Sequence, residues 1–117
     1  MKIKTAELIG AALDWATAQC EGHHLPPMDE YTETWLATRR FSTDWALGGA
    51  IIERERIQLR NHAEIQGLWI ASAWKSISNF GITVFEDGET ALIAAMRCYV
   101  ASCLGEEVEV PDELINL

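Results

Sequence analysis

Arg97 is the residue whose type and position most strongly suggest chemistry, because it lies inside the apolar run from Ala91 to Leu104. An unpaired guanidinium buried in a helix would cost several kcal/mol. Arg97 must therefore reach solvent along its aliphatic stem or meet an anion. Two interpretations of that anion stay open. It is either an internal carboxylate (Asp14, Asp44 or Glu53) or a carboxylate or phosphate group on a ligand.

The segment from Phe41 to Gly49 is a second candidate, and we predict that it forms a turn-rich, ordered loop. Its tandem glycines, Gly48 and Gly49, would let the backbone approach a ligand closely or adopt a positive φ. Trp45 offers a stacking face, and Asp44 can bind ribose hydroxyls or cap a turn. The segment is neither a P-loop nor a dinucleotide-binding fingerprint, because the required spacing and flanking lysine are absent. The alternative is a tight turn with Trp45 anchored in the core.

These residues together define a hypothetical ligand site. Five tryptophans are many for a chain of 117 residues, and one or two of them beside Arg97 would form a pocket for a planar anionic molecule such as a nucleotide. A lone carboxylate is weak evidence for catalysis, and no serine or histidine has the setting of a nucleophile or triad. We therefore predict a binding site without catalytic residues. The predicted site consists of Thr43, Asp44, Trp45, Gly48, Gly49, Glu53 and Arg97.

Three functions stay open for such a chain. The leading hypothesis is non-enzymatic binding of a small anionic, nucleotide-like ligand or of a host protein. The second is a small enzyme that acts on a nucleotide-like substrate, with Asp44 or Glu53 as acid or base. The third is a structural role, in which surplus tryptophan side chains line the interface of a homo-oligomer.

Neither a metal site nor a cofactor is expected. The segment Cys20-Glu21-Gly22-His23-His24 supplies half of a zinc site at most, and the only other histidine is His62. Three cysteines are an odd number, and Cys98 and Cys103 are spaced so that one helix would not present both on the same face. We predict reduced thiols packed within helices rather than a disulfide framework.

The charge and hydropathy of the chain limit its partners. Nine basic and eighteen acidic residues give a formal net charge of −9, so nucleic acid would repel the chain, and we predict no direct nucleic acid binding. The acidity either keeps the protein soluble or forms a face that mimics DNA or docks on a basic host protein. No stretch approaches the roughly 20 apolar residues of a membrane span, and the amphipathic N-terminus is a poor signal peptide. We therefore predict a cytoplasmic protein without membrane contact.

The elements that position these residues begin with a helix from about Thr5 to Glu21, with Thr5 as its N-cap. Residues 23–33 are predicted to form a loop around Pro26-Pro27. Residues 34–38 are predicted to form a short strand. Residues 50–59 suit either a strand or one exposed helical turn, because isoleucines alternate there with a run of charges of both signs.

Two later segments have the pattern of half-buried strands. Residues 68–74 alternate large and small side chains, and residues 82–85 form a second such segment. The connection between them contains Asn79 and Gly81. The two strands are therefore predicted to form a hairpin.

The closing helix is the clearest element of the chain. It is predicted to run from about residue 88 to 104, buried on most faces, with Asp87 as its cap and Gly105 at its end. Residues 112–117 would pack as a last turn. The pattern predicts an α+β domain, with two helices (about 5–21 and 88–104) packed on a small, mainly antiparallel sheet. No linker divides the chain, so residues 1–117 are predicted to form a single domain.

Two runs of sequence resemble a known family. They are Ser42-Thr43-Asp44-Trp45-Ala46-Leu47-Gly48-Gly49-Ala50-Ile51-Ile52-Glu53 and Thr90-Ala91-Leu92-Ile93-Ala94-Ala95-Met96-Arg97-Cys98-Tyr99-Val100-Ala101-Ser102, which continues through Gly105-Glu106-Glu107-Val108-Glu109-Val110-Pro111. The chain thereby resembles the NinX family, small proteins encoded in the nin region of lambdoid bacteriophages and their prophages. The opening, with Ala12-Leu13-Asp14-Trp15-Ala16, is similar as well. The resemblance is weakest over residues 23–36 and 62–80.

The resemblance implies a phage or prophage accessory protein that acts inside the bacterial cell, and it implies no particular reaction. One departure from the family concerns the predicted loop. Ala50 follows the double glycine where the family leads us to expect proline, and the turn is relaxed as a result.

Overall fold

The computed structural model describes residues 1–23, 30–77 and 80–115. Its helices are α1 (Gly10–Cys20), α2 (Glu30–Ala37), α3 (Trp45–Glu55) and α4 (Ala91–Leu104), with short 3₁₀ turns η1 (Thr5–Glu7) and η2 (Asp112–Leu114). Its strands are β1 (Lys2–Lys4), β2 (Gln58–Asn61), β3 (Trp69–Ile77), β4 (Phe80–Gly88) and β5 (Glu107–Glu109). The α+β class is confirmed, although the described residues form four α-helices where two were predicted. None of the helices in these ranges is long and apolar enough to cross a membrane.

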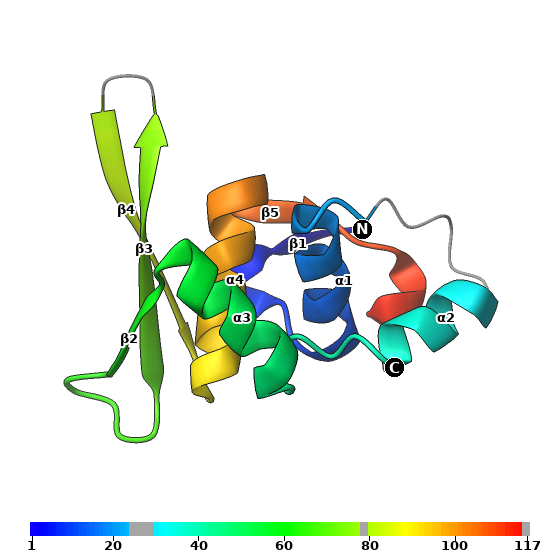
Figure 1. Cartoon of the computed structure of the whole chain (residues 1–117), viewed down its shortest axis with the longest axis horizontal. Coiled ribbons are helices and arrows are strands. Elements are labelled where there is room, and N and C mark those ends of the chain that lie inside the picture. The colour runs from blue at the N-terminus through cyan, green and yellow to red at the C-terminus, as the bar shows by residue number, and fades with distance from the viewer. Residues whose placement is uncertain (24–29, 78–79, 116–117) are drawn as a thin grey trace.

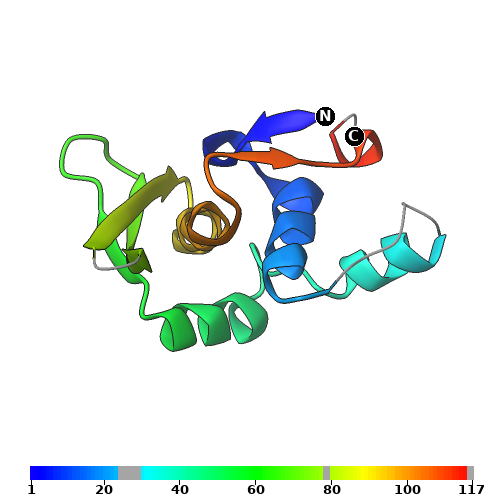
Figure 2. The same ribbon diagram turned by 90° about the horizontal axis from the view of Figure 1, so that it is seen from above.

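Helix α4 lies at the centre of the molecule (Figure 1). The sheet of β2, β3 and β4 packs against one side of it, α1 packs against the other, and α3 covers a third. Figure 2 looks nearly along α4 and shows it between the sheet and α1. Buried side chains therefore occur on most faces of the helix, as the apolar run predicted. They are Ala91, Leu92, Ala94, Ala95, Met96, Cys98, Tyr99, Val100 and Ala101.

The ends of α4 are fixed by a side chain and a glycine. Thr90 Oγ1 accepts a hydrogen bond from the Ile93 N–H at 3.1 Å, so Thr90 is the N-cap. The prediction that Asp87 is the cap is wrong, because Asp87 still belongs to β4. Gly105 ends the helix with a φ of +90°, which confirms the predicted C-terminal glycine.

The predicted hairpin is confirmed as β3 and β4, which pair antiparallel along their whole length. The short strand β2 pairs with β3 on its other side, so the strand order is β2-β3-β4. Gly81 lies in β4 opposite Ser76, whereas Asn79 lies outside the described residues. Ala71 and Ala73 on β3 are buried, because they face α4.

The N-terminal segment differs from the prediction. Thr5 is fully buried in η1, and its hydroxyl donates to the Gly105 carbonyl at 2.6 Å. Its N–H donates to the Glu106 carbonyl at 2.8 Å. Thr5 is therefore no helix cap, and α1 begins only at Gly10, without a side-chain cap. This arrangement ties the start of the chain to the end of α4, beside the pairing of β1 with β5.

The segment between α1 and β2 is helical where strands and loops were predicted. Residues 30–37 form α2, so the predicted strand at 34–38 is wrong and the predicted loop at 23–33 is too long. Residues 24–29 of that loop lie outside the described residues. Residues 50–59 were predicted to form either a strand or one exposed helical turn. The structure has helix α3 up to Glu55, and β2 begins at Gln58. The last turn predicted for residues 112–117 is present as η2 over Asp112–Leu114, and residues 116–117 lie outside the described residues.

Replacing Thr5 by valine removes the hydroxyl but keeps the shape of the side chain. We expect the free energy of unfolding to fall by about 1–3 kcal/mol, because the Gly105 carbonyl loses its partner in a partly buried place. Urea titration of both proteins measures the difference. Thr38→Val is the control, because the Thr38 hydroxyl donates to the Trp35 carbonyl at an exposed position where water can replace it, and it should change stability by no more than about 0.5 kcal/mol. Equal effects of the two substitutions would contradict a structural role for the Thr5 hydroxyl.

Candidate functional site

The Arg97 guanidinium binds backbone carbonyls rather than a carboxylate. Its Nε–H donates to the Leu8 carbonyl at 2.8 Å, and Nη1 donates to the Asp87 carbonyl at 2.9 Å. None of the ion pairs formed by the described residues joins Arg97 to Asp14, Asp44 or Glu53, so the first of the two interpretations, an internal ion pair, is wrong. These two hydrogen bonds hold the segment before α1 and the end of β4 against α4.

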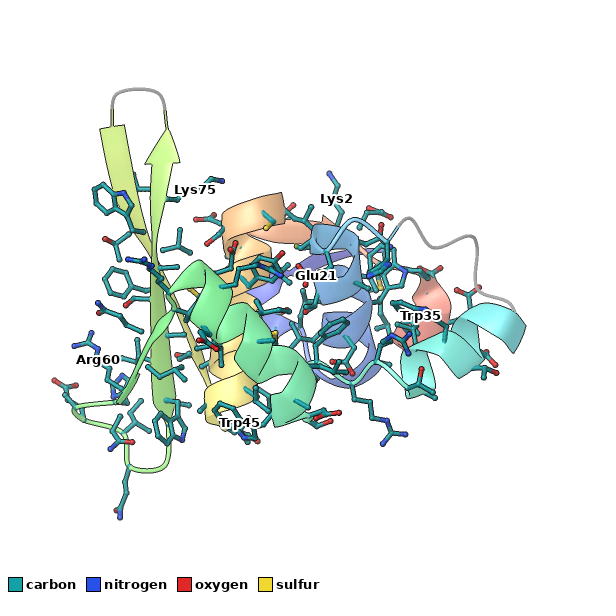
Figure 3. The ribbon with its side chains drawn as sticks, viewed as in Figure 1. Lys2, Glu21, Trp35, Trp45, Arg60 and Lys75 are labelled. Atoms are coloured by element: carbon teal, nitrogen blue, oxygen red, sulfur yellow. The ribbon has the colours of Figure 1, made fainter. Side chains whose placement is uncertain are left out.

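A different arginine forms the ion pair that joins the helices. Arg54, near the end of α3, binds Glu21 through Nη2 and Oε2 at 2.7 Å and through Nη1 and Oε1 at 3.0 Å. The Tyr99 hydroxyl of α4 donates to the same Glu21 Oε2 at 2.6 Å. Arg54 holds the pKa of Glu21 below its usual value, although partial burial opposes the shift. These contacts join the ends of α1 and α3 to the middle of α4, around the Glu21 that Figure 3 labels.

The residues predicted to form a ligand loop belong to α3 and its N-cap. Asp44 Oδ1 accepts a hydrogen bond from the Ala46 N–H at 2.9 Å and caps the helix. The predicted turn-rich loop therefore ends at Asp44, because the cap starts a helix where a turn was expected. Trp45 is 57% exposed, which contradicts the alternative that it is anchored in the core. Glu53 is exposed further along α3.

The two glycines of α3 have separate environments. Gly48 is buried, and a Cβ atom there would collide with the Phe41 carbonyl and lie 2.6 Å from Leu92 Cδ2 on α4. Gly49 has room, since its Cβ would lie 3.4 Å from the Trp45 ring. Gly48 is therefore required for the close approach of α3 to α4 and to Phe41, which gives it a packing role.

Replacing each glycine by alanine in turn tests whether the two positions differ in the space that they leave for a side chain. We expect Gly48→Ala to lower the free energy of unfolding by about 2 kcal/mol or more, because the backbone must move to admit the methyl group. Gly49→Ala should raise it by up to about 1 kcal/mol, because alanine favours a helix over glycine. Thermal or urea unfolding of both variants measures the contrast. If Gly48→Ala is as stable as the parent, Gly48 is not needed for the packing of α3 against α4.

A cavity of about 540 Å³ lies between α1, α2 and η2. In Figure 1 these elements stand at the end of the molecule opposite the sheet. Of the seven residues in the predicted ligand site, Thr43 lines this cavity and the other six do not. The complete lining is Gly10, Ala11, Asp14, Glu33, Leu36, Ala37, Arg40, Ser42, Thr43, Glu113 and Leu114.

Asp14 is a buried acidic residue in the lining of this cavity. It is 5% exposed, and its Oδ1 accepts a hydrogen bond from the Ser42 N–H at 2.8 Å. The Ser42 hydroxyl lies near the same carboxyl group and is 2% exposed, yet it has no hydrogen-bond partner in the part of the chain that the structure describes. A buried hydroxyl without a partner is costly, so Ser42 adds an unsatisfied polar group beside the Asp14 carboxyl group.

The charges around the cavity determine which ligands suit it. Burial raises the pKa of Asp14, and the adjacent Ser42 hydroxyl, the hydrogen bond from the Ser42 N–H and the positive charge of Arg40 oppose that shift. Glu33 and Glu113 add two exposed carboxylates, against the one guanidinium of Arg40. The described lining therefore favours a group that donates hydrogen bonds, and it has neither the cysteines nor the histidines of a zinc site.

Asp14 and Ser42 were missing from the predicted site although the sequence carried a signal for one of them. Asp14 stands among buried positions of α1, just as Arg97 stands among buried positions of α4. The same argument about an isolated charge would have selected Asp14. Ser42 gave no comparable signal, because its contact with Asp14 joins residues that are 28 positions apart in the sequence.

The raised pKa of Asp14 predicts how stability depends on pH. As the pH rises above the ordinary value of 3.8, the unfolded chain loses this proton before the folded protein does, and unfolding becomes easier. Asp14→Asn removes that effect and keeps an acceptor for the Ser42 N–H. We expect the parent to lose stability relative to Asp14→Asn from about pH 4 upward, until the folded pKa is passed. Unfolding titrations at a series of pH values test this, and a difference that does not vary with pH would contradict it.

The comparison with known proteins supplies a family. A family model described as Bacteriophage P22, NinX, matches residues 4–103 of the chain. No curated protein matches the chain. The matched range contains α1, α2, α3, the sheet of β2, β3 and β4, and α4 almost to its end, so it includes Asp14 and Ser42. The chain belongs to the phage NinX family, as the resemblance predicted.

Proposed function

We propose that this member of the NinX family is a phage accessory protein that acts by binding, and that a small ligand occupies the cavity around Asp14. The observation that carries the proposal is a carboxyl group that is almost fully buried and yet lines a cavity of about 540 Å³. Cavities of this size hold small molecules in many proteins, with an apolar lining and a few polar groups that fix the orientation.

The lining supports a ligand with an apolar body and an amino or amidinium group. Ala11, Leu36 and Leu114 supply apolar walls, and Asp14 accepts the donor group. The sequence predicted an anionic, nucleotide-like ligand, and Arg40 is the cation of the described lining that could meet a phosphate. A nucleobase would also offer an exocyclic amino group to Asp14. The negative charges of the nearby Glu33 and Glu113 favour an uncharged nucleoside or a cationic amine over a negatively charged nucleotide.

The proposal is one of binding without catalysis because of the groups that meet in the cavity. A carboxyl and a hydroxyl lie together at Asp14 and Ser42, but the described lining offers no histidine or lysine to activate the hydroxyl. The enzyme hypothesis placed the acid or base at Asp44 or Glu53. Asp44 already accepts the helix-capping hydrogen bond, and Glu53 lies outside the cavity lining.

Thermal-shift measurements against nucleosides, nucleoside monophosphates and small amines test the proposal. A ligand at a hundredfold excess over its dissociation constant should stabilise the native state by about 2.7 kcal/mol. We expect nucleosides or amines to raise the melting temperature of the parent, and Asp14→Asn to abolish that rise.

Asp44→Asn is the matched control for this experiment. Asparagine caps a helix as well as aspartate does, so the variant should fold normally and keep the ligand-induced shift. A shift lost in Asp44→Asn but kept in Asp14→Asn would instead support the site predicted from the sequence. If no compound of the three classes shifts the melting temperature, the proposal of a small-ligand site is wrong.

A further inference from the structure

Among the residues that the structure describes, helices cover only one side of the sheet of β2, β3 and β4. Helix α4 packs against the side that carries Ala71 and Ala73, and the other side points away from the rest of the molecule in Figures 1 and 2. Trp74 on this second side is 70% exposed, and Phe85 is 57% exposed. In Figure 3 the labelled Arg60 also points away from the helices, whereas Lys75 points toward their side of the sheet.

The register of the strands shows how this side is laid out, and we call it the outer face. Arg60 of β2, Ile70 of β3 and Asp87 of β4 form one row across it. Gln58, Ser72 and Phe85 form the next row, and Trp74 and Thr83 the one after that. Opposite charges therefore stand at the two edges of a single row, with the aromatic side chains beside it.

Trp74 is held in place on the outer face by a glycine of the neighbouring strand. A Cβ atom at Gly81 would collide with the Trp74 ring, so the ring lies directly over the bare backbone of β4. Trp74 is thus largely exposed to solvent while one face of its ring packs on the neighbouring strand. A large, fixed aromatic side chain on a flat surface is typical of an anchor residue in a protein interface.

The charges on the outer face indicate a second copy of the chain as its occupant. The whole chain has a net charge of −9, but this face has one arginine and one aspartate and is therefore neutral. A two-fold axis parallel to β3 would lay β2 of each copy over β4 of the other. Each Arg60 would then meet the Asp87 of the second copy, and the two Trp74 rings would meet at the axis. Such a self-complementary surface is what a symmetric dimer requires.

We propose that two chains form a dimer through their outer faces, with their β3 strands parallel and with Arg60 paired to the second copy's Asp87 on both sides of the axis. The proposal is independent of the ligand cavity, because the cavity lies at the other end of the molecule. A nucleic acid is not favoured here, because the neutral face has no excess of positive charge.

Charge reversal tests the pairing directly. Arg60→Asp and Asp87→Arg each place like charges together at both contacts of the dimer, so each variant alone should weaken dimerisation about tenfold or more. In an equimolar mixture of the two variants, both contacts of a mixed dimer become attractive again. Sedimentation velocity should show a parent with twice the mass of one chain, two monomeric variants, and a dimer restored by mixing.

Trp74→Ser and Trp45→Ser form a second, matched pair of variants. Both remove an exposed tryptophan, but Trp45 lies on α3, away from the outer face. We expect Trp74→Ser to be monomeric and Trp45→Ser to stay dimeric. A parent that is monomeric at high micromolar concentration would overturn the proposal, and so would variants that fail to recover a dimer on mixing. Recovery also excludes misfolding as the cause of the loss, because misfolded chains would not pair.

Discussion

Helix α4 carries buried apolar side chains on most of its faces, and this fact determines how the other elements are arranged. A helix that is apolar on most sides must be covered on each of those sides, and each buried side chain such as Met96 or Val100 contributes about 1.5–3 kcal/mol. The sheet, α1 and α3 each cover part of it. Gly48 lets α3 come close enough to do so. The packing role of Gly48 follows from the need to bury α4.

The polar groups around α4 complete this arrangement. Arg97 is the one charged residue of the helix, and it donates to the carbonyls of Leu8 and Asp87, which belong to two different segments that flank α4. Thr5 joins the N-terminal segment to Gly105 at the other end of the helix. Both side chains connect parts of the chain that are distant in sequence, and they satisfy backbone groups that burial would otherwise leave without partners.

The sequence predicted the elements whose pattern is set by local rules. The closing helix and the β3–β4 hairpin were correct, because a long apolar run and an alternation of side chains identify them. Helix α2 was missed because it is short. The start of α3 was missed because it is capped by Asp44, and aspartate is equally common in turns. The cavity was missed for a different reason. It forms where α1 packs against residues that are distant in the sequence, and local sequence patterns do not predict such tertiary contacts.

Asp14 connects the structure to the proposed function, because the cost of burying its carboxyl group is repaid when a ligand donates to it. A carbon-13 NMR titration that follows the side-chain carboxyl groups of the folded protein measures this residue directly. We expect Asp14 to lose its proton at a higher pH than an ordinary aspartate, and a bound amine or nucleoside to lower this pKa. An Asp14 that titrates at an ordinary pH, and that does not respond to any such ligand, would contradict the account.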